Sequence, residues 1–307
     1  MKSTGNVAAE IAQRIINYAQ SDAPDPLREP PTFAPLPMTD TGFEPETFVL
    51  LVSDLQAGHK TVTFNFEVLK ERVHRLVERT LRVTALHRKS HPIPNLEVFL
   101  LGDLVHGERV GKTVDLDELE DVVKVQLFDV VIPLLEWMIE EFSTHFETVN
   151  IRCVRGNHGV VSRENANTTN WDDIAYYFLQ SRFRDFKNVK FTIAERFFQL
   201  VDVMGWKFLL VHGDQIPMYL NIPIYGVTMR SMRWQKTIGA FDVLALGHFH
   251  NFTAFDWNDS LIVINGTFVT DDEWVAKILG LKGSCCQTLM SVHPNKGVTF
   301  VSKIQLV

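Results

Sequence analysis

The segment FVLLVSDLQAGH, residues 48–59, decides the fold of this chain. Its apolar run leads directly into a polar turn at Asp54. A short apolar run bounded by turn residues predicts a buried β-strand, here Phe48–Ser53. Four further segments repeat the pattern, and the strands they predict are Leu96–Gly102, Val149–Arg155, Trp206–Val211 and Phe241–Gly247.

Each of these predicted strands is followed by side chains that can bind metal. They are Asp54, Asp103 in FLLGD, Asn157 and His158 in VRGNH, His212 in LLVHGD, and His248 and His250 in LALGHFH. Strand ends in a layered α/β protein meet at one edge of a sheet, which is the usual place for its chemistry. The sequence therefore predicts that these carboxylates, imidazoles and the carboxamide converge on one site.

The rest of the chain supplies helices and further strands. Periodicity predicts helices at Phe66–Arg88, at Leu116–Phe146 with a bend near Pro133, and at Trp171–Phe183. Further strands are expected at Val189–Thr192, Arg196–Asp202, Leu261–Asn265, Thr288–Val292 and Val298–Ile304. We therefore expect an α/β fold in which two β-sheets form a sandwich flanked by helices.

The chain has 307 residues, and we expect a catalytic domain at residues 47–307 preceded by an arm at residues 1–46. Val7–Tyr18 has the spacing of an amphipathic helix, and seven prolines between Pro24 and Pro45 exclude helix or central strand after it. The arm either wraps the domain, carries its helix to another copy in a homo-oligomer, or is a loose linker.

Composition excludes several classes of protein. No apolar stretch reaches the roughly 20 residues of a membrane span, so no membrane partner is expected. Three cysteines do not form a disulfide framework, which favours a cytoplasmic location. The net charge of −7 argues against a protein that coats nucleic acid. A basic run on or after the first long helix is either a local basic patch or a solvated face: Arg72, Arg75, Arg79, Arg82, Arg88 and Lys89.

The order of these motifs from Phe48 to Asn265 resembles the calcineurin-like metallophosphoesterase superfamily. The phrases LLVSDLQAGH and FLLGDLVHG are most similar to its Mre11-like branch and to phage-encoded phosphoesterases. The resemblance implies a four-layer fold. It also implies two divalent ions, with Mn²⁺ favoured and Fe, Zn²⁺ or Mg²⁺ admitted, and hydrolysis of a phosphate ester by a metal-bridging hydroxide.

The resemblance also assigns roles to residues. Asp103 is expected to bridge the ions, Asp54 and His250 to hold the first, and Asn157, His212 and His248 to hold the second. His158 is the expected catalytic residue, which contacts the phosphate and protonates the leaving group. His106 could line the substrate pocket, and Arg155 and Arg163 could bind phosphate oxygens.

Gln56 departs from the family pattern, which is Asp-x-His where this chain has Asp54-Leu55-Gln56. Three readings are open. Gln56 coordinates the first ion through its carbonyl oxygen, which we favour; or His59 supplies the missing nitrogen; or the first ion binds weakly.

The leading function is hydrolysis of a phosphodiester or a small phosphomonoester by a metal-dependent hydrolase. A narrower alternative is a DNA nuclease similar to Mre11, with nucleic acid as substrate. A third, of a different class, is a metal-poor scaffold that binds partners without catalysis, which Gln56 alone favours. Residue types do not identify the substrate.

Overall fold

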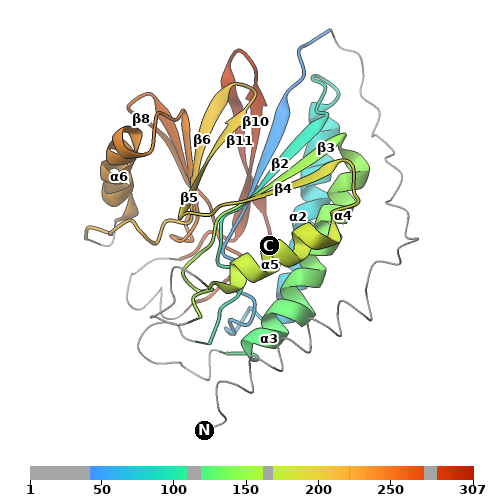
Figure 1. Cartoon of the computed structure of the whole chain (residues 1–307), viewed down its shortest axis with the longest axis vertical. Helices are drawn as coiled ribbons and strands as arrows, with labels where there is room; N and C mark the ends of the chain where they lie inside the picture. Colours follow the sequence, from blue (N-terminus) through green and yellow to red (C-terminus); the bar gives the residue numbers. More distant parts are fainter. Residues whose placement is uncertain (1–41, 109–118, 162–168, 221, 273–281) are drawn as a thin grey trace. The chain divides into compact units, whose positions relative to one another are not determined.

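The computed structural model describes residues 42–108, 119–161, 169–220, 222–272 and 282–307 (Figure 1). The predicted helix Val7–Tyr18, nearly all of the proline-rich arm, and Arg163 lie outside these residues. None of the helices in the described ranges is long and apolar enough to cross a membrane. Cys153, Cys285 and Cys286 are buried free thiols, as expected of small apolar strand residues.

The first sheet has the strand order β11-β10-β1-β2-β3-β4. Its strands are β1 (Thr47–Val52), β2 (Asn95–Leu100), β3 (Thr148–Cys153), β4 (Val189–Ile193), β10 (Cys286–His293) and β11 (Gly297–Gln305). Strands β1 to β4 are parallel, while β10 pairs antiparallel with β1 and with β11. The carboxyl ends of β1, β2 and β3 therefore lie side by side at one edge.

The second sheet has the order β5-β6-β7-β9-β8. Its strands are β5 (Phe198–Val203), β6 (Trp206–Val211), β7 (Val243–Leu246), β8 (Thr253–Trp257) and β9 (Ser260–Ile264). Strands β6, β7 and β9 are parallel. Strand β5 pairs antiparallel with β6, and β8 pairs antiparallel with β9. Strand β8, which the sequence did not predict, forms a hairpin with β9.

Side chains from both sheets form the central core. Leu51 and Phe99 of the first sheet pack with Phe208 and Leu210 of the second, and the rings of Phe99 and Phe208 lie 5.7 Å apart. Because successive strand residues point to opposite faces, Leu209 and Val211 of β6 face away from this core. Both faces of the second sheet are therefore covered.

Helices cover the two outer faces. On the outer face of the first sheet lie α2 (Phe66–His87), α4 (Ile132–His145) and α5 (Trp171–Arg182) (Figure 1). Helix α6 (Pro223–Thr237) covers the second sheet through Val227 and Trp234. The order helix, sheet, sheet, helix confirms the predicted two-sheet sandwich with flanking helices.

The predicted helix Leu116–Phe146 begins at α3 (Val123–Val125) within the described residues and is irregular. A π-helical turn, η2 (Gln126–Val131), separates α3 from α4. Proline has no backbone N–H to donate, so regular α-helical bonding cannot run through Pro133. The irregular turn lies immediately before this proline.

Helix α6 was not predicted as a helix, because its sequence contains Gly226 and is surrounded by aromatic residues and prolines. Gly226 is required here, since a Cβ on it would lie 2.0 Å from the Pro217 carbonyl oxygen. Pro223 fits at the first turn, where its missing N–H has no helical partner. The helix therefore has a start signal that sequence analysis could have used.

Several arginines of the basic run on or after α2 bind backbone carbonyls, while Arg82 and Lys89 are exposed. Arg72 and Arg79 donate to the backbone carbonyls of Phe268 and Gln305. Arg88 is buried and donates to the Ile93 carbonyl at 2.7 Å and to the His145 carbonyl at 2.8 Å. These guanidinium groups fix the helix to the surrounding chain.

Candidate metal centre

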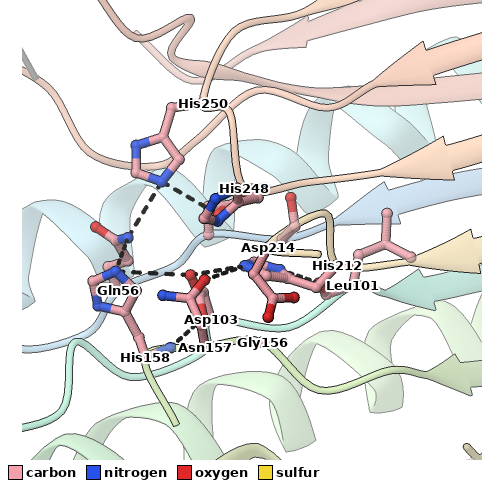
Figure 2. Close-up of polar contacts among 12 residues, drawn as sticks. Gln56, Leu101, Asp103, Gly156, Asn157, His158, His212, Asp214, His248 and His250 are labelled. Carbon is pink, nitrogen blue, oxygen red and sulfur yellow. Dashed lines mark hydrogen bonds and ion pairs between the residues drawn. The ribbon is translucent and has the colours of Figure 1, made fainter. Parts of the chain in front are cut away.

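The predicted site residues meet at the carboxyl ends of the strands (Figure 2). The first sheet supplies Asp54 and Gln56 after β1, Asp103 after β2, and Asn157 and His158 after β3. The second sheet supplies His212 after β6, and His248 and His250 after β7. Because the two sheets face each other, these side chains approach from both sides of the sandwich.

The backbone at these positions is strained. Among the described residues, ten that are not glycine have positive φ, and five of them are Asp54, Gln56, Asp103, His248 and His250. Left-handed backbone is uncommon for side chains of these types and persists where the surrounding structure enforces it. Here the loop after β1 is held by the loop after β2, since Asp54 N–H donates to the Gly102 carbonyl and Gln56 N–H to the Asp103 carbonyl.

Asp103 and His212 lie at the centre of the site. His212 Nε2 is 3.0 Å from Asp103 Oδ2 and 3.1 Å from Asn157 Oδ1. In the neutral ring, Nδ1–H donates to the Leu101 carbonyl at 2.7 Å, so Nε2 carries a lone pair. Asp103 Oδ2 is buried and accepts no hydrogen bond. With a neutral ring three lone-pair atoms face one another, and either a proton on Nε2 or a cation removes their repulsion.

The electrostatics of the site agree with this geometry. Burial opposes a positive charge on His212, but the carboxylate of Asp103 outweighs it and raises the pKa of His212 to about 10. Burial likewise opposes ionisation of Asp103, yet His212 lowers the pKa of this carboxyl below its usual value. A proton or a metal ion between the two would supply the favoured positive charge.

His248 completes one group of donors. Asp103, His212 and His248 each offer a ligand atom, and these three atoms lie within 4.8 Å of one another. Burial and then the neighbouring His212 lower the pKa of His248 to about 3, so its imidazole is neutral near pH 7 and free to bind a metal. These donors fit one divalent ion.

Asp54 and His250 form the other side of the site. His250 Nε2 lies 3.3 Å from Asp54 Oδ1, and both carboxylate oxygens of Asp54 accept from the His248 N–H at 3.2 Å. Burial opposes ionisation of Asp54, but its hydrogen bond to His250 lowers the pKa of the carboxyl. Asp54 and His250 thus form a second pair of close donors next to the group of Asp103, His212 and His248.

Gln56 lies between the two groups and directs its carboxamide nitrogen toward two imidazoles. Gln56 Nε2 is 3.2 Å from His250 Nε2 and 3.3 Å from His158 Nε2. Its carbonyl oxygen, Oε1, faces His59 Nδ1 at 3.3 Å. A ligand role for Gln56 therefore requires the carboxamide to turn and present the oxygen instead.

His158 is held by hydrogen bonds, one at its backbone N–H and one at its ring Nδ1. Its N–H donates to Asp103 Oδ1 at 2.7 Å, and its Nδ1 lies 3.0 Å from the His106 carbonyl oxygen. The latter bond orients the ring. Its other nitrogen, Nε2, lies 3.8 Å from Asp103 Oδ2 and so faces the metal ligands.

Two further histidines lie beside His158. The rings of His59 and His106 are stacked with centroids 4.3 Å apart, and His106 is 5.3 Å from His158. Both are buried, and burial lowers the pKa of His59 to about 4 and that of His106 to about 2. His59 thus contacts the carboxamide of Gln56. His106 lies next to the expected catalytic residue, consistent with a place in the pocket wall.

Arg155 points to a different partner from the one expected. Its guanidinium pairs with Asp173 at 3.1 Å and donates to the Glu195 carbonyl. Sequence reasoning also missed Asp172, a fully buried carboxylate in the first turn of α5. Asp172 accepts hydrogen bonds from the loops that carry Asp103 and Asn157. Burial and then the charge of Asp103 raise the pKa of Asp172 to about 7.

Comparisons with known proteins place this arrangement in a family. No curated protein sequence matches the chain significantly. Among solved structures, an archaeal phosphodiesterase is 13% identical with a TM-score of 0.40, covering 83% of this chain and 98% of its own. A Vps29 complexed with zinc from Entamoeba histolytica is 12% identical with a TM-score of 0.39, covering 84% and 99%.

A hypothetical protein from Pyrococcus horikoshii is 11% identical with a TM-score of 0.44 and covers 84% of this chain and 87% of its own. The sequence itself matches the model of the calcineurin-like phosphoesterases over residues 49–263. This range includes every predicted ligand and His158. The chain belongs to the calcineurin-like phosphoesterase family.

Proposed function

We propose that this chain is a divalent-metal-dependent hydrolase of phosphate esters. The observation that carries the proposal is the convergence of Asp103 Oδ2, His212 Nε2 and Asn157 Oδ1. The hydrogen bond from His212 Nδ1 to the Leu101 carbonyl aims Nε2 at these two oxygens, so an ion that displaces its proton would meet all three donors. A divalent cation is the ligand for which such a mixed set of oxygen and nitrogen donors is suited.

The donors divide into two groups that share Asp103. His212, His248 and Asn157 would hold one ion, and Asp54 and His250 the other, with the oxygen of a turned Gln56 as a further ligand. Bound there, divalent ions would polarise a phosphoryl oxygen and lower the pKa of a water molecule. The donor set suits Mn²⁺, Fe or Zn²⁺ and admits Mg²⁺.

His158 would act on the leaving group. Its Nδ1 is engaged by the His106 carbonyl, so Nε2, which here lies 3.3 Å from Gln56 Nε2, is the nitrogen that would face a substrate once the Gln56 carboxamide turns. A proton on Nε2 would be delivered to the departing oxygen, which is general acid catalysis.

The preferred substrate class is a phosphodiester or a small phosphomonoester. A DNA nuclease similar to Mre11 would need a cationic path for the duplex, which a net charge of −7 disfavours. Nucleic acid is therefore one of the substrates to be assayed. The other substrates are bis-p-nitrophenyl phosphate, p-nitrophenyl phosphate and cyclic nucleotides, each with added Mn²⁺.

The test removes the shared ligand. Asp103→Asn keeps the shape of the side chain and an acceptor for the His158 N–H, but removes the charge that holds both ions. Asp202→Asn is the matched control, since this exposed carboxylate only caps the turn at Gly205. Metal content by elemental analysis and turnover should both be lost in Asp103→Asn and retained in Asp202→Asn.

Two outcomes would contradict the proposal. Undiminished metal and turnover in Asp103→Asn would reject the assigned ligands. Wild-type protein that binds no Mn²⁺ in isothermal titration and cleaves none of the substrates would favour the non-catalytic scaffold.

A further inference from the structure

Asp172 is a buried carboxylate whose hydrogen bonds lie outside its own helix. It is the second residue of α5 and has no exposed surface. Its Oδ2 accepts from the Asp103 N–H at 3.0 Å and the Gly156 N–H at 2.8 Å. Its Oδ1 accepts from the Leu104 N–H at 3.1 Å. A single side chain therefore binds two loops that are far apart in sequence.

These two loops carry the central metal ligands. Asp103 itself lies in the first, and Gly156 directly precedes Asn157 in the second. The N–H groups of Asp103 and Leu104 point to Asp172. They lie just past the end of β2, where its pairing with β3 has ended. Each of these N–H groups is buried and would be left without an acceptor if the Asp172 side chain were absent, which is costly. The hydrogen bonds to Asp172 take the place that strand pairing would otherwise fill.

Asn170 binds the second loop from the same turn of α5. As the N-cap of the helix it accepts from the Asp172 N–H at 2.8 Å, and its Nδ2 donates to the Gly156 carbonyl at 2.8 Å. Both backbone groups of Gly156 are thus bound by the first turn of α5. The position of Asn157, one residue later, follows from the position of this helix.

An acidic residue in the first turn of a helix ordinarily stabilises its own helix through the dipole. Asp173, the neighbouring residue, is available for that role, and its carboxylate pairs with Arg155. Asp172 directs both oxygens to other loops, and its complete burial carries a desolvation cost that a dipole effect does not require. Its placement needs another explanation.

We propose that Asp172 is a positioning residue for the metal centre. By binding the N–H groups of Asp103 and Gly156 with one oxygen, it fixes the separation of the Asp103 and Asn157 side chains that face His212. The proposal rests on the metal-dependent function proposed above. Partners behind metal ligands commonly change metal affinity by 10–100-fold when they are replaced.

The test is Asp172→Asn, which keeps the size of the side chain but replaces one accepting oxygen with an NH₂ group. In either orientation of the carboxamide, at least one backbone N–H would face this NH₂ group and lose its acceptor. The matched control is Asp173→Asn, which removes a neighbouring carboxylate that binds only Arg155 among the contacts described here. Mn²⁺ affinity is measured by isothermal titration on protein stripped with chelator.

We expect Asp172→Asn to weaken Mn²⁺ binding by roughly 10–100-fold, and Asp173→Asn to change it by less than about threefold. Turnover of Asp172→Asn should recover when Mn²⁺ is raised, because the ligands themselves are intact. A purely structural role predicts a lower unfolding midpoint of the metal-free protein with unchanged Mn²⁺ affinity. That result would overturn the proposal.

A second variant covers the case in which Asp172→Asn does not fold. Asn170→Asp keeps the N-cap acceptor but loses the donor to the Gly156 carbonyl, so it should weaken Mn²⁺ binding by roughly tenfold. Unchanged affinity in this variant would also reject positioning by α5. Failure of the underlying function looks different, since wild-type protein would then bind no Mn²⁺, or Asp103→Asn would bind it as well as wild type.

Discussion

Gly102 and Gly156 lie so close together that a Cβ on Gly102 would be 2.3 Å from the Gly156 backbone nitrogen. The reverse addition is equally blocked, because a Cβ on Gly156 would lie 2.1 Å from Asp103 Oδ1. The two ligand loops therefore touch through their backbones. Their ligands can approach His212 together only because neither glycine carries a side chain.

Gly102→Ala should consequently damage the metal centre as well as the fold. Gly102 has φ +90°, so alanine pays about 1–2 kcal/mol of backbone strain there, and the contact with Gly156 adds about 1–3 kcal/mol. Gly205→Ala is the matched control, since Gly205 has φ +92° with no atom within 4 Å of an added Cβ. Chemical denaturation and Mn²⁺ titration of both variants separate the two effects.

The control should lose only the strain energy and bind Mn²⁺ like wild type. Gly102→Ala should unfold at lower denaturant and also bind Mn²⁺ at least tenfold more weakly. Equal losses of stability in the two variants, with metal affinity intact in both, would show that the loops tolerate separation.

His158→Asn should separate chemistry from metal binding. Asn cannot deliver a proton, but none of the proposed ligands is changed. Metal content should stay near that of wild type, while turnover falls by roughly 10²–10⁴-fold. Steady-state kinetics on a series of substituted phenyl phosphodiesters provide the measurement.

The loss in His158→Asn should be largest for substrates with poor leaving groups, because these depend most on protonation. A loss that is the same for good and poor leaving groups would assign His158 to binding of the phosphate. Loss of one metal equivalent would instead make it a ligand.

His87, at the end of α2, should make stability depend on pH. Its ring packs on Phe48 and Phe300, with centroids 5.2 Å and 4.6 Å away. Burial there lowers the pKa of His87 below 6.5, despite the opposing charge of Glu46. Because the unfolded chain binds the proton more readily, the stability from His87 is present above pH 6.5 and is lost as pH falls below it.

His87→Leu should remove this part of the pH dependence. The unfolding midpoint of the variant minus that of wild type should increase as the pH falls from 7.5 to 5.5. Both midpoints are measured with chelator present. The histidines of the metal centre are the same in both proteins, so their titration cancels in the comparison. A difference between the two proteins that does not change with pH would contradict the prediction.

The motifs predicted the positions of the ligands because strand ends are local features. The run Leu50-Leu51-Val52 is buried, and the turn after it brings Asp54 to the sheet edge, as apolar runs and turn residues suggest. The two-sheet sandwich was expected from the order of strands and helices together with the family resemblance. Local pattern alone does not specify which sheet faces which.

Asp172 could not be recognised from sequence. In NWDD, residues 170–173, it is one of two acidic residues at a helix start, and both look like ordinary dipole partners. Its role arises only when the loop at Asp103, 69 residues earlier, closes on the same turn. The partners of Arg72 and Arg79 could not be predicted for the same reason, since the Phe268 and Gln305 carbonyls belong to distant segments.

Gln56 provides the last prediction: if two ions bind as proposed, its carboxamide should determine how well the first ion binds. To coordinate a metal it must exchange the contacts of Nε2 with His158 and His250 for a metal–oxygen bond, and Oε1 must leave His59. A neutral oxygen is also a weaker donor than an imidazole for Mn²⁺, Fe or Zn²⁺. Titration of Mn²⁺ should therefore show a tight phase followed by a weak one.

Substitutions at Gln56 and His59 assign the weak phase. Gln56→His supplies a nitrogen ligand without a turn of the side chain, so the weak phase should tighten and the preference for Zn²⁺ over Mg²⁺ should rise. Gln56→Ala removes the oxygen and should weaken that phase further. His59→Ala should leave it nearly unchanged, because His59 lies behind the carboxamide rather than at the ions. Loss of the weak phase in His59→Ala but not in Gln56→Ala would make His59 the ligand. No change in either variant would leave the first ion to Asp54, Asp103 and His250, and Gln56 would then act only through its hydrogen bonds to the two imidazoles.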